Sequence, residues 1–215
     1  MRTLWKSGVT ALLCVGLIFG TGMAAPSSSM GVVLQADHAT LGTSEVAVGT
    51  AIFDGDNLQT NGSGSLRARL GQSQVYLLPD SGVLVHQLSK GFSASLSGGT
   101  VVLSSVGGET FQVLADGATI QPKSDQPTLA QVSCISPSEL ILSARHGDLL
   151  VSLGDETQTV SEGTSYRMMI NPGTGLGPQG MFSAGRNRFV LILITAAAVG
   201  AGIATYLVLI TNDTP

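Results

Sequence analysis

Two aspartates that flank a glycine, Asp54 and Asp56, are the side chains of this sequence best placed to do chemistry. Paired carboxylates could share a calcium ion, because calcium prefers several oxygen ligands. The residues that follow lack the further oxygen ligands and the closing glutamate of a calcium loop. The sequence therefore favours a turn with exposed carboxylates, in which Gly55 supplies a positive φ and Asp56 binds the backbone. No metal site and no cofactor is predicted.

Other catalytic patterns are missing from the sequence. The three histidines, His38, His86 and His146, are widely separated, and none belongs to a ligand-spaced pair. His86 falls in an apolar run, which is typical of a strand histidine. No Gly-x-Ser-x-Gly elbow is present, and the paired glycines lack the lysine and helix of a phosphate loop. The sequence predicts a protein that is not an enzyme.

Charge and cysteine content restrict the function further. Asp and Glu outnumber Lys and Arg by 14 to 10, and this acidic balance without a basic stripe argues against nucleic-acid binding. Of the two cysteines, Cys14 lies near the N-terminus within a predicted export signal. Removal of that signal would leave Cys134 alone, so no internal disulfide is predicted and Cys134 is expected to be a buried strand residue.

The middle of the chain has the pattern of an all-β protein. Short runs rich in Val, Leu, Ile and Thr alternate with turn residues at spacings of about 8–12 residues, which is typical of a sandwich, barrel or coil of strands. Asp116-Gly117 favours a tight hairpin turn. The strands are expected at 65–70, 74–78, 82–88, 92–96, 100–104, 109–115, 118–121, 139–144, 149–153, 157–160 and 164–170.

The segment 49–60, GTAIFDGDNLQT, resembles the signature of the FecR-like domain, the extracytoplasmic domain of bacterial iron-transport regulators and related envelope proteins. Three further parts resemble the family in the same order: 65–70 with 75–81, then 96–101, then 147–164. The resemblance covers roughly residues 45–170. The turn residues that carry the signature are Gly49, Asp54, Gly55, Asp56, Gly163 and Thr164.

The resemblance implies a multi-stranded β domain, a sandwich or β-coil, outside the cytoplasm. The best-known members of the family pass a signal from an outer-membrane transporter to a cytoplasmic sigma factor. They carry a cytoplasmic N-terminal region, one membrane span and then the outer domain. This sequence differs, since its candidate span comes after the β domain and only five residues follow it.

The N-terminus has the layout of an export signal. Arg2 and Lys6 precede a short apolar stretch and a group of small residues, so we expect a signal peptide over 1–24 that is cleaved after Ala24. The alternative is an uncleaved membrane anchor. Both interpretations export the middle of the chain.

The C-terminal run from Phe189 to Ile210 contains no charged side chain. As a helix it would be roughly 33 Å long, enough to cross a hydrocarbon core of about 30 Å. We therefore expect a transmembrane helix over 189–210, the alternative being a helix buried in the protein core. Arg186 and Arg188 oppose this topology, because the positive-inside rule would place them in the cytoplasm.

Small residues recur every four positions within this run, at Ala196, Gly200 and Ala204. Such spacing lets two membrane helices pack closely, which predicts a homo-oligomer formed through the helix. The alternative is that alanine and glycine are simply common in membrane helices.

The expected organisation has six parts: a signal peptide (1–24), an N-terminal extension of the β domain (25–44), a FecR-like β domain (45–171), a Gly/Pro-rich tether (172–188), a transmembrane helix (189–210) and a short tail (211–215). The sequence predicts a non-enzymatic interaction or scaffold domain that is anchored in the inner membrane, lies in the periplasm and binds an envelope protein. The alternatives are a transmembrane signalling component of a sigma-factor and iron-transport system, and a polysaccharide-binding module with several exposed aromatic rings.

Overall fold

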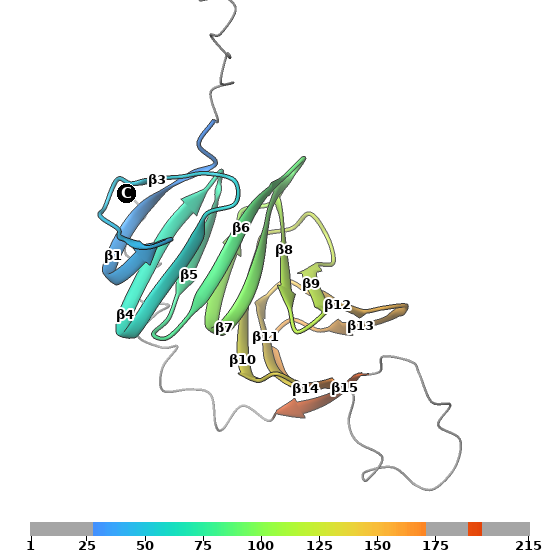
Figure 1. Ribbon diagram of the computed structural model, residues 1–215. Helices are drawn as coiled ribbons and strands as arrows, with labels where there is room; N and C mark the ends of the chain where they lie inside the picture. Colours follow the sequence, from blue (N-terminus) through green and yellow to red (C-terminus); the bar gives the residue numbers. More distant parts are fainter. Residues whose placement is uncertain (1–27, 171–188, 195–215) are drawn as a thin grey trace, which may run out of the picture.

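The computed structural model describes residues 28–170 and 189–194, and every regular element within them is a strand of a single sheet. The strands, shown in Figure 1, are β1 (Gly31–Leu41), β2 (Ser44–Glu45), β3 (Ala51–Ile52), β4 (Asn57–Leu70), β5 (Ser73–Leu77), β6 (Gly82–Leu88), β7 (Gly91–Ser105), β8 (Thr110–Ala115), β9 (Ala118–Pro122), β10 (Thr128–Ser136), β11 (Glu139–His146), β12 (Leu149–Leu153), β13 (Glu156–Val160), β14 (Thr164–Ile170) and β15 (Phe189–Ile194). The predicted all-β class is confirmed.

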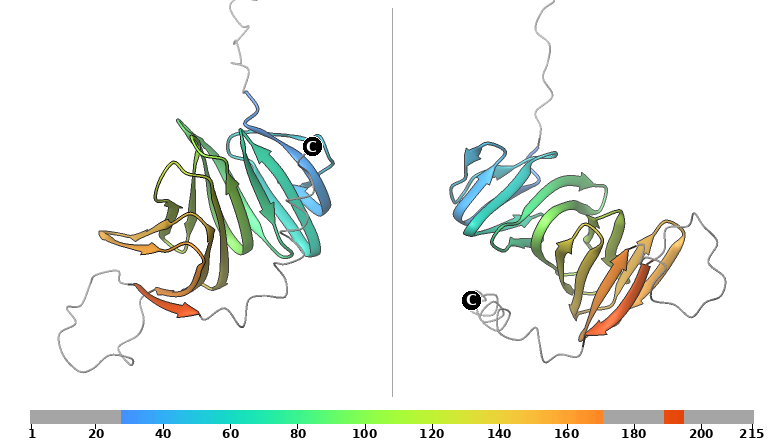
Figure 2. Two further views of the ribbon diagram at one scale, coloured as in Figure 1. Left: turned by 180° about the vertical axis from the view of Figure 1, so that it is seen from behind. Right: turned by 60° about the horizontal axis from the view of Figure 1, so that its bottom comes forward.

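The sheet folds into two layers, and the long strands β4 and β7 take part in both. The first half of β7 pairs with β6 and β8 in one layer, whereas its second half pairs with β5 and β10 in the other. In the same way β4 pairs with β6 near its start and with β5 near its end. The sheet curls, as Figures 1 and 2 show, so that β13 contacts β11 and β14 of the other layer.

The space between the layers is filled by one apolar core. Along the end of β4 the side chains of Leu66, Ala68 and Leu70 are buried, and the arginines between them point outward. This two-residue alternation is what a strand with one buried face requires. In the layer that contains β6 and β8, the rings of Phe92 and Phe111 lie 6.5 Å apart, centroid to centroid, within the same core.

The strands expected at 92–96 and 100–104 are two halves of β7. The glycine pair between them forms no turn, because Gly82 pairs with Gly98 and a register shift follows at Val83. The irregularity lets one strand pass from one layer into the other. Sequence patterning cannot separate such a bulge from a turn, since both use glycine.

The N-terminal part of the sheet begins earlier than the signature motif. β1 pairs with β4 from Gly31↔Leu70 to Leu41↔Leu58, and Val33 and Ala39 are buried in the core. The range 25–44, set apart from the sequence as an extension, therefore contains a strand of the main sheet.

The hairpin predicted at Asp116-Gly117 is confirmed. It joins β8 to β9 in antiparallel register, and both turn residues have positive φ, 48° and 81°. Cys134 lies in a strand, as predicted, where it pairs with Gly99 and Leu140, but it is only half-buried.

The C-terminal apolar run differs from the prediction. Its first six residues are strand β15, which pairs antiparallel with β14 from Ile170↔Phe189 to Ser165↔Ile194, so no helix begins at Phe189 here. An apolar run without periodicity fits a buried strand as well as a helix, and its β-branched residues favour the strand once an open edge is available. Within the described residues no helix is long and apolar enough to cross a bilayer. Residues 1–27, 171–188 and 195–215 lie outside the described structure, so the signal, the tether and the remainder of the span stay predictions.

Candidate functional site

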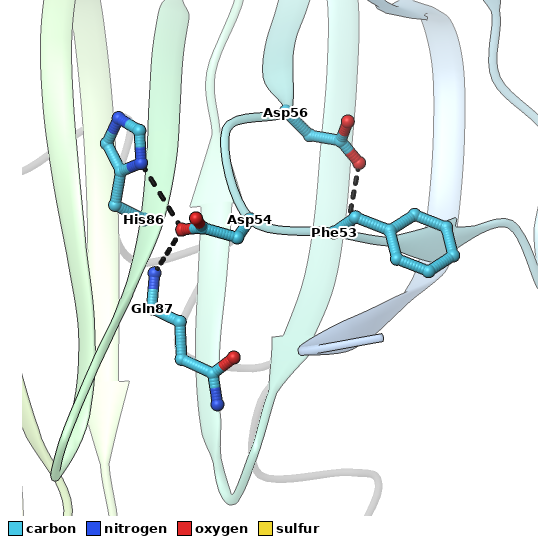
Figure 3. A network of polar contacts seen from close by, with 5 residues as sticks. All are labelled: Phe53, Asp54, Asp56, His86 and Gln87. Carbon is cyan, nitrogen blue, oxygen red and sulfur yellow. Dashed lines mark hydrogen bonds and ion pairs between the residues drawn. The ribbon is translucent and has the colours of Figure 1, made fainter. Parts of the chain in front are cut away.

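The signature turn at Asp54-Gly55-Asp56 joins β3 to β4 and is closed by its own side chain. Asp56 Oδ2 accepts a hydrogen bond of 2.7 Å from the backbone N–H of Phe53, as Figure 3 shows. Gly55 has a φ of +84°, a conformation that favours glycine. The prediction for Gly55 is confirmed, and Asp56 binds the backbone three residues before it.

Asp54 fixes this turn to β6. Its Oδ1 accepts a 2.8 Å hydrogen bond from the backbone N–H of Gln87 and lies 3.2 Å from Nδ1 of His86. The Gln87 N–H holds the pKa of the Asp54 carboxyl below its ordinary value, and His86 acts in the same direction. We call Phe53, Asp54, Asp56, His86 and Gln87 the Asp54 cluster.

The Asp54 cluster has few means of doing chemistry. The side chains of His86 and Asp54 are 46% and 61% exposed, so water competes with any reactant. Among the described residues no serine or cysteine hydrogen-bonds to His86 as a nucleophile would. No group of three metal-ligating side chains that could hold an ion occurs in the described part of the chain. These hydrogen bonds hold the turn between β3 and β4 against the neighbouring strand β6.

A second, buried set of polar groups lies where β4, the turn after β5 and the middle of β7 meet. The Thr60 hydroxyl accepts a 3.0 Å hydrogen bond from Ser81 N–H and donates one of 2.5 Å to the Leu78 carbonyl. The Ser81 hydroxyl accepts from Thr100 N–H at 2.8 Å and lies 3.0 Å from the Thr100 carbonyl. Thr100 Oγ1 in turn donates to Ser133 Oγ at 2.9 Å. We call Thr60, Ser81, Thr100 and Ser133 the Thr60 cluster.

Gly99 completes the junction. Its φ is +78°, and a Cβ there would lie 2.3 Å from the Asp80 carbonyl oxygen and 2.4 Å from Ser81 Oγ. No side chain fits in that space. Thr60, Ser81 and Gly99 come from the first three of the four motifs on which the family resemblance rests, so these three motifs meet at one structural junction.

The remaining signature residues close turns elsewhere. Gly49 has a φ of +88° and donates to the Val33 carbonyl at 2.9 Å, while Gly163 has a φ of +74° and donates to the Ala144 carbonyl at 2.7 Å. Thr164 N–H donates to the Ser161 carbonyl and closes the second turn. One turn stands before β3 and the other before β14, so the structure does not bring them together.

Sequence reasoning missed the Thr60 cluster. It selected aspartates and glycines, whereas Thr60, Ser81 and Thr100 were read only as parts of strands and motifs. The available signal was a hydroxyl residue at or near the end of each of the first three motifs: Thr60, Ser81 and Thr100. Ala196, Gly200 and Ala204, the predicted helix-packing residues, lie outside the described residues.

Aromatic side chains bear on the polysaccharide hypothesis. Phe92 and Phe111 are buried, whereas Tyr76 and Tyr166 are partly buried. Of the five aromatic residues within 45–171, Phe53 is the one that is exposed, at 37%. A sugar-binding face of several rings is not formed by these five residues.

Comparisons with known proteins add little. No family model and no curated protein matches the sequence. Two crystal structures of a candidate anti-sigma factor from Parabacteroides distasonis, at 2.50 Å and 1.65 Å resolution, are similar to the chain with a TM-score of 0.47 and 10% identity. The similarity covers 64% of this chain, which spans 59% of the length of that protein. At this level the likeness assigns no function.

Proposed function

We propose that the chain is a FecR-like interaction domain without catalytic activity, held on the outer face of the cytoplasmic membrane by its C-terminal apolar run and bound there to an envelope protein. The observation that carries this proposal is β15. Val190 and Ile192, which lie on one face of this strand, are each 46% exposed, and Leu193 on the opposite face is 54% exposed. Exposed apolar side chains on an edge strand are typical of contact with a protein or a membrane.

The polar side chains support a binding role rather than catalysis. Asp54, Asp56 and His86 hold a turn against β6, and Asp148 accepts the Glu162 N–H at 3.0 Å beside the last turn. Each of these groups makes a hydrogen bond that stabilises the fold. A partner is therefore expected at strand edges and loop tips.

The proposed family membership is supported by the way in which the motifs meet in the fold. Three motifs that are separate in the sequence contribute Thr60, Ser81 and Gly99 to one buried junction, where each residue type has a physical reason. A chance resemblance of glycine-rich turns would not require such agreement.

The location is tested with a reporter enzyme that is active only outside the cytoplasm, fused after Gly173 of the full-length chain. We expect an active fusion, and an inactive one when residues 1–24 are removed. Activity that does not depend on residues 1–24, or no activity in either fusion, would contradict the proposed export.

The partner is tested by photocrosslinking in intact cells from positions with exposed apolar side chains. A photoreactive residue at Val48, Val106 or Ile135, which are 67%, 57% and 54% exposed, should form an adduct of defined mass with an envelope protein. The same residue at the exposed Glu45 serves as the control. Adducts that match the Glu45 control, or an adduct with a cytoplasmic protein, would argue against this role.

A further inference from the structure

β15 occupies the edge of the sheet next to β14, as the right-hand view of Figure 2 shows. The two strands are separated by residues 171–188, far more than the two to five residues of an ordinary hairpin loop. The pairing therefore depends on the strands themselves and not on a tight turn.

The side chains of β15 show what this edge accepts. Phe189 is 2% exposed and belongs to the core, and Leu191 packs against it from the same face. They lie opposite Ile170 and Met168 of β14. The edge thus binds an extended segment with a large apolar side chain at every second position.

If the apolar run 189–210 spans a membrane, residues 189–194 must form part of the membrane helix. The full run of 22 residues makes a helix of roughly 33 Å, but the 16 residues of 195–210 make one of only about 24 Å. That is shorter than a hydrocarbon core of about 30 Å. Docking of β15 on the sheet and a full membrane span are therefore alternatives.

β14 is also held by contacts that do not involve β15. It pairs with β11 over six residues, Met168 is fully buried, and Arg167 Nε lies 2.9 Å from Glu139 Oε1 of β11. Departure of β15 would leave a row of unpaired N–H and C=O groups and an empty place for the Phe189 ring. Such an edge pairs readily with another strand.

We propose that the β14 edge is a strand-binding site, occupied by residues 189–194 when the apolar run is outside the membrane and by an extended apolar segment of a partner protein when the run spans it. The inference rests on the membrane anchoring of the proposed function. Insertion of the run into the membrane then exposes the β14 edge in the same step. The partner segment resembles β15, since it has large apolar side chains at alternate positions.

A disulfide lock tests the first half of the proposal. Met168→Cys with Leu191→Cys joins directly opposed residues of β14 and β15, whose Cα atoms in such pairs are about 4.5–5.5 Å apart, within disulfide range. Ser143→Cys with Ser165→Cys is the matched control, because it joins opposed residues of β11 and β14, keeps the Arg167–Glu139 ion pair and does not link β15. Both pairs are placed in the full chain with Cys14→Ser and Cys134→Ser.

We call the oxidised form of the Met168→Cys, Leu191→Cys chain the locked chain. We expect carbonate to extract the locked chain from vesicles, while its reduced form and the oxidised control stay integrated. If the locked chain integrates as fully as its reduced form, docking and spanning are compatible and the inference is overturned. If neither the reduced form nor the control integrates, the proposed membrane anchor fails, and the inference fails with it.

A synthetic peptide tests the second half. The probe has the sequence of residues 189–194 with a lysine at each end, and the control peptide has serine in place of Phe189 and Leu191. We expect the probe to bind the vesicle-integrated chain at least tenfold more tightly than the control peptide, and not to bind the locked chain. Equal binding of the two peptides, or equal binding of the probe to the locked and integrated chains, would overturn the strand-binding site.

Discussion

The Asp54 cluster and the Thr60 cluster both draw on the segments 53–60 and 81–87, yet the first is exposed to solvent and the second is largely buried. Asp54 is 61% exposed, so water can replace its partners when a hydrogen bond is lost. Thr60 and Ser81 are 5% and 2% exposed, so water has little access to the groups that they satisfy. We therefore expect the fold to depend more on these buried residues than on the aspartates that are most conspicuous in the sequence.

The largest expected effect tests the junction of the Thr60 cluster. Gly99→Ala imposes a left-handed φ on a side chain, which costs about 1–3 kcal/mol, and its Cβ meets the Asp80 carbonyl at 2.3 Å, which adds about 1–3 kcal/mol. Urea unfolding followed by circular dichroism measures the loss. Gly98→Ala is the control, because nothing lies within 4 Å of its Cβ. Equal losses in the two variants would show that Gly99 is not the critical residue.

The next prediction compares a serine-to-alanine substitution at a buried position with the same substitution at an exposed position. Ser81→Ala leaves the partly buried Thr100 N–H without its acceptor, for which we expect a loss of about 1–3 kcal/mol in the free energy of unfolding. Ser97→Ala removes an exposed hydroxyl that lies 3.1 Å from the Gly82 carbonyl, and should change stability by less than about 0.5 kcal/mol. The order of the two losses in the same urea assay decides the comparison, and a reversed order would contradict it.

The Asp54 cluster should respond to acid. The Gln87 N–H keeps the pKa of Asp54 below its ordinary value of 3.8, so the carboxylate stabilises the folded chain above that pH and the stabilisation is lost as pH falls through the folded pKa. Asp54→Asn should be less stable than the unchanged chain at neutral pH, by less than Ser81→Ala, and the two stability curves should converge in acid below pH 3.8.

Asp148→Asn provides a parallel case, because the Glu162 N–H and then Lys123 lower the pKa of Asp148 in the same way. A difference between the unchanged chain and either variant that stays constant into acid would show that these carboxylates do not act through their charge.

The smallest expected effect uses Cys134 as a reporter of the junction, since this residue pairs with Gly99. Burial raises the pKa of its thiol from 9.0 to about 11, with a further contribution from Asp116, which lowers the reactive thiolate about 100-fold. In a Cys14→Ser chain, alkylation at mildly alkaline pH should be slow. It should accelerate in Gly99→Ala and remain slow in Asp54→Asn, and equal rates in both variants would break the distinction between the clusters.

Much of the local structure could be predicted from the sequence. Alternation located the strand at 65–70, the spacing of apolar runs between turn residues located the one at 164–170, and Asp116-Gly117 identified its hairpin. A strand face and a tight turn depend on neighbouring residues. The turn at Asp54 was predicted for the same reason. The partners of Asp54 were not, since His86 and Gln87 are brought close only by the pairing of β4 with β6.

By itself the sequence determined the all-β class, most of the strands and turns, and an apolar C-terminal run. Tertiary structure alone decided that β7 crosses both layers, that Thr60, Ser81 and Gly99 meet, and that Phe189–Ile194 is a strand. The physical reason is the range of the interactions. Turn and strand preferences act between neighbours in the chain, whereas a continuous apolar run has no period of its own and takes the structure that an open edge or a membrane offers.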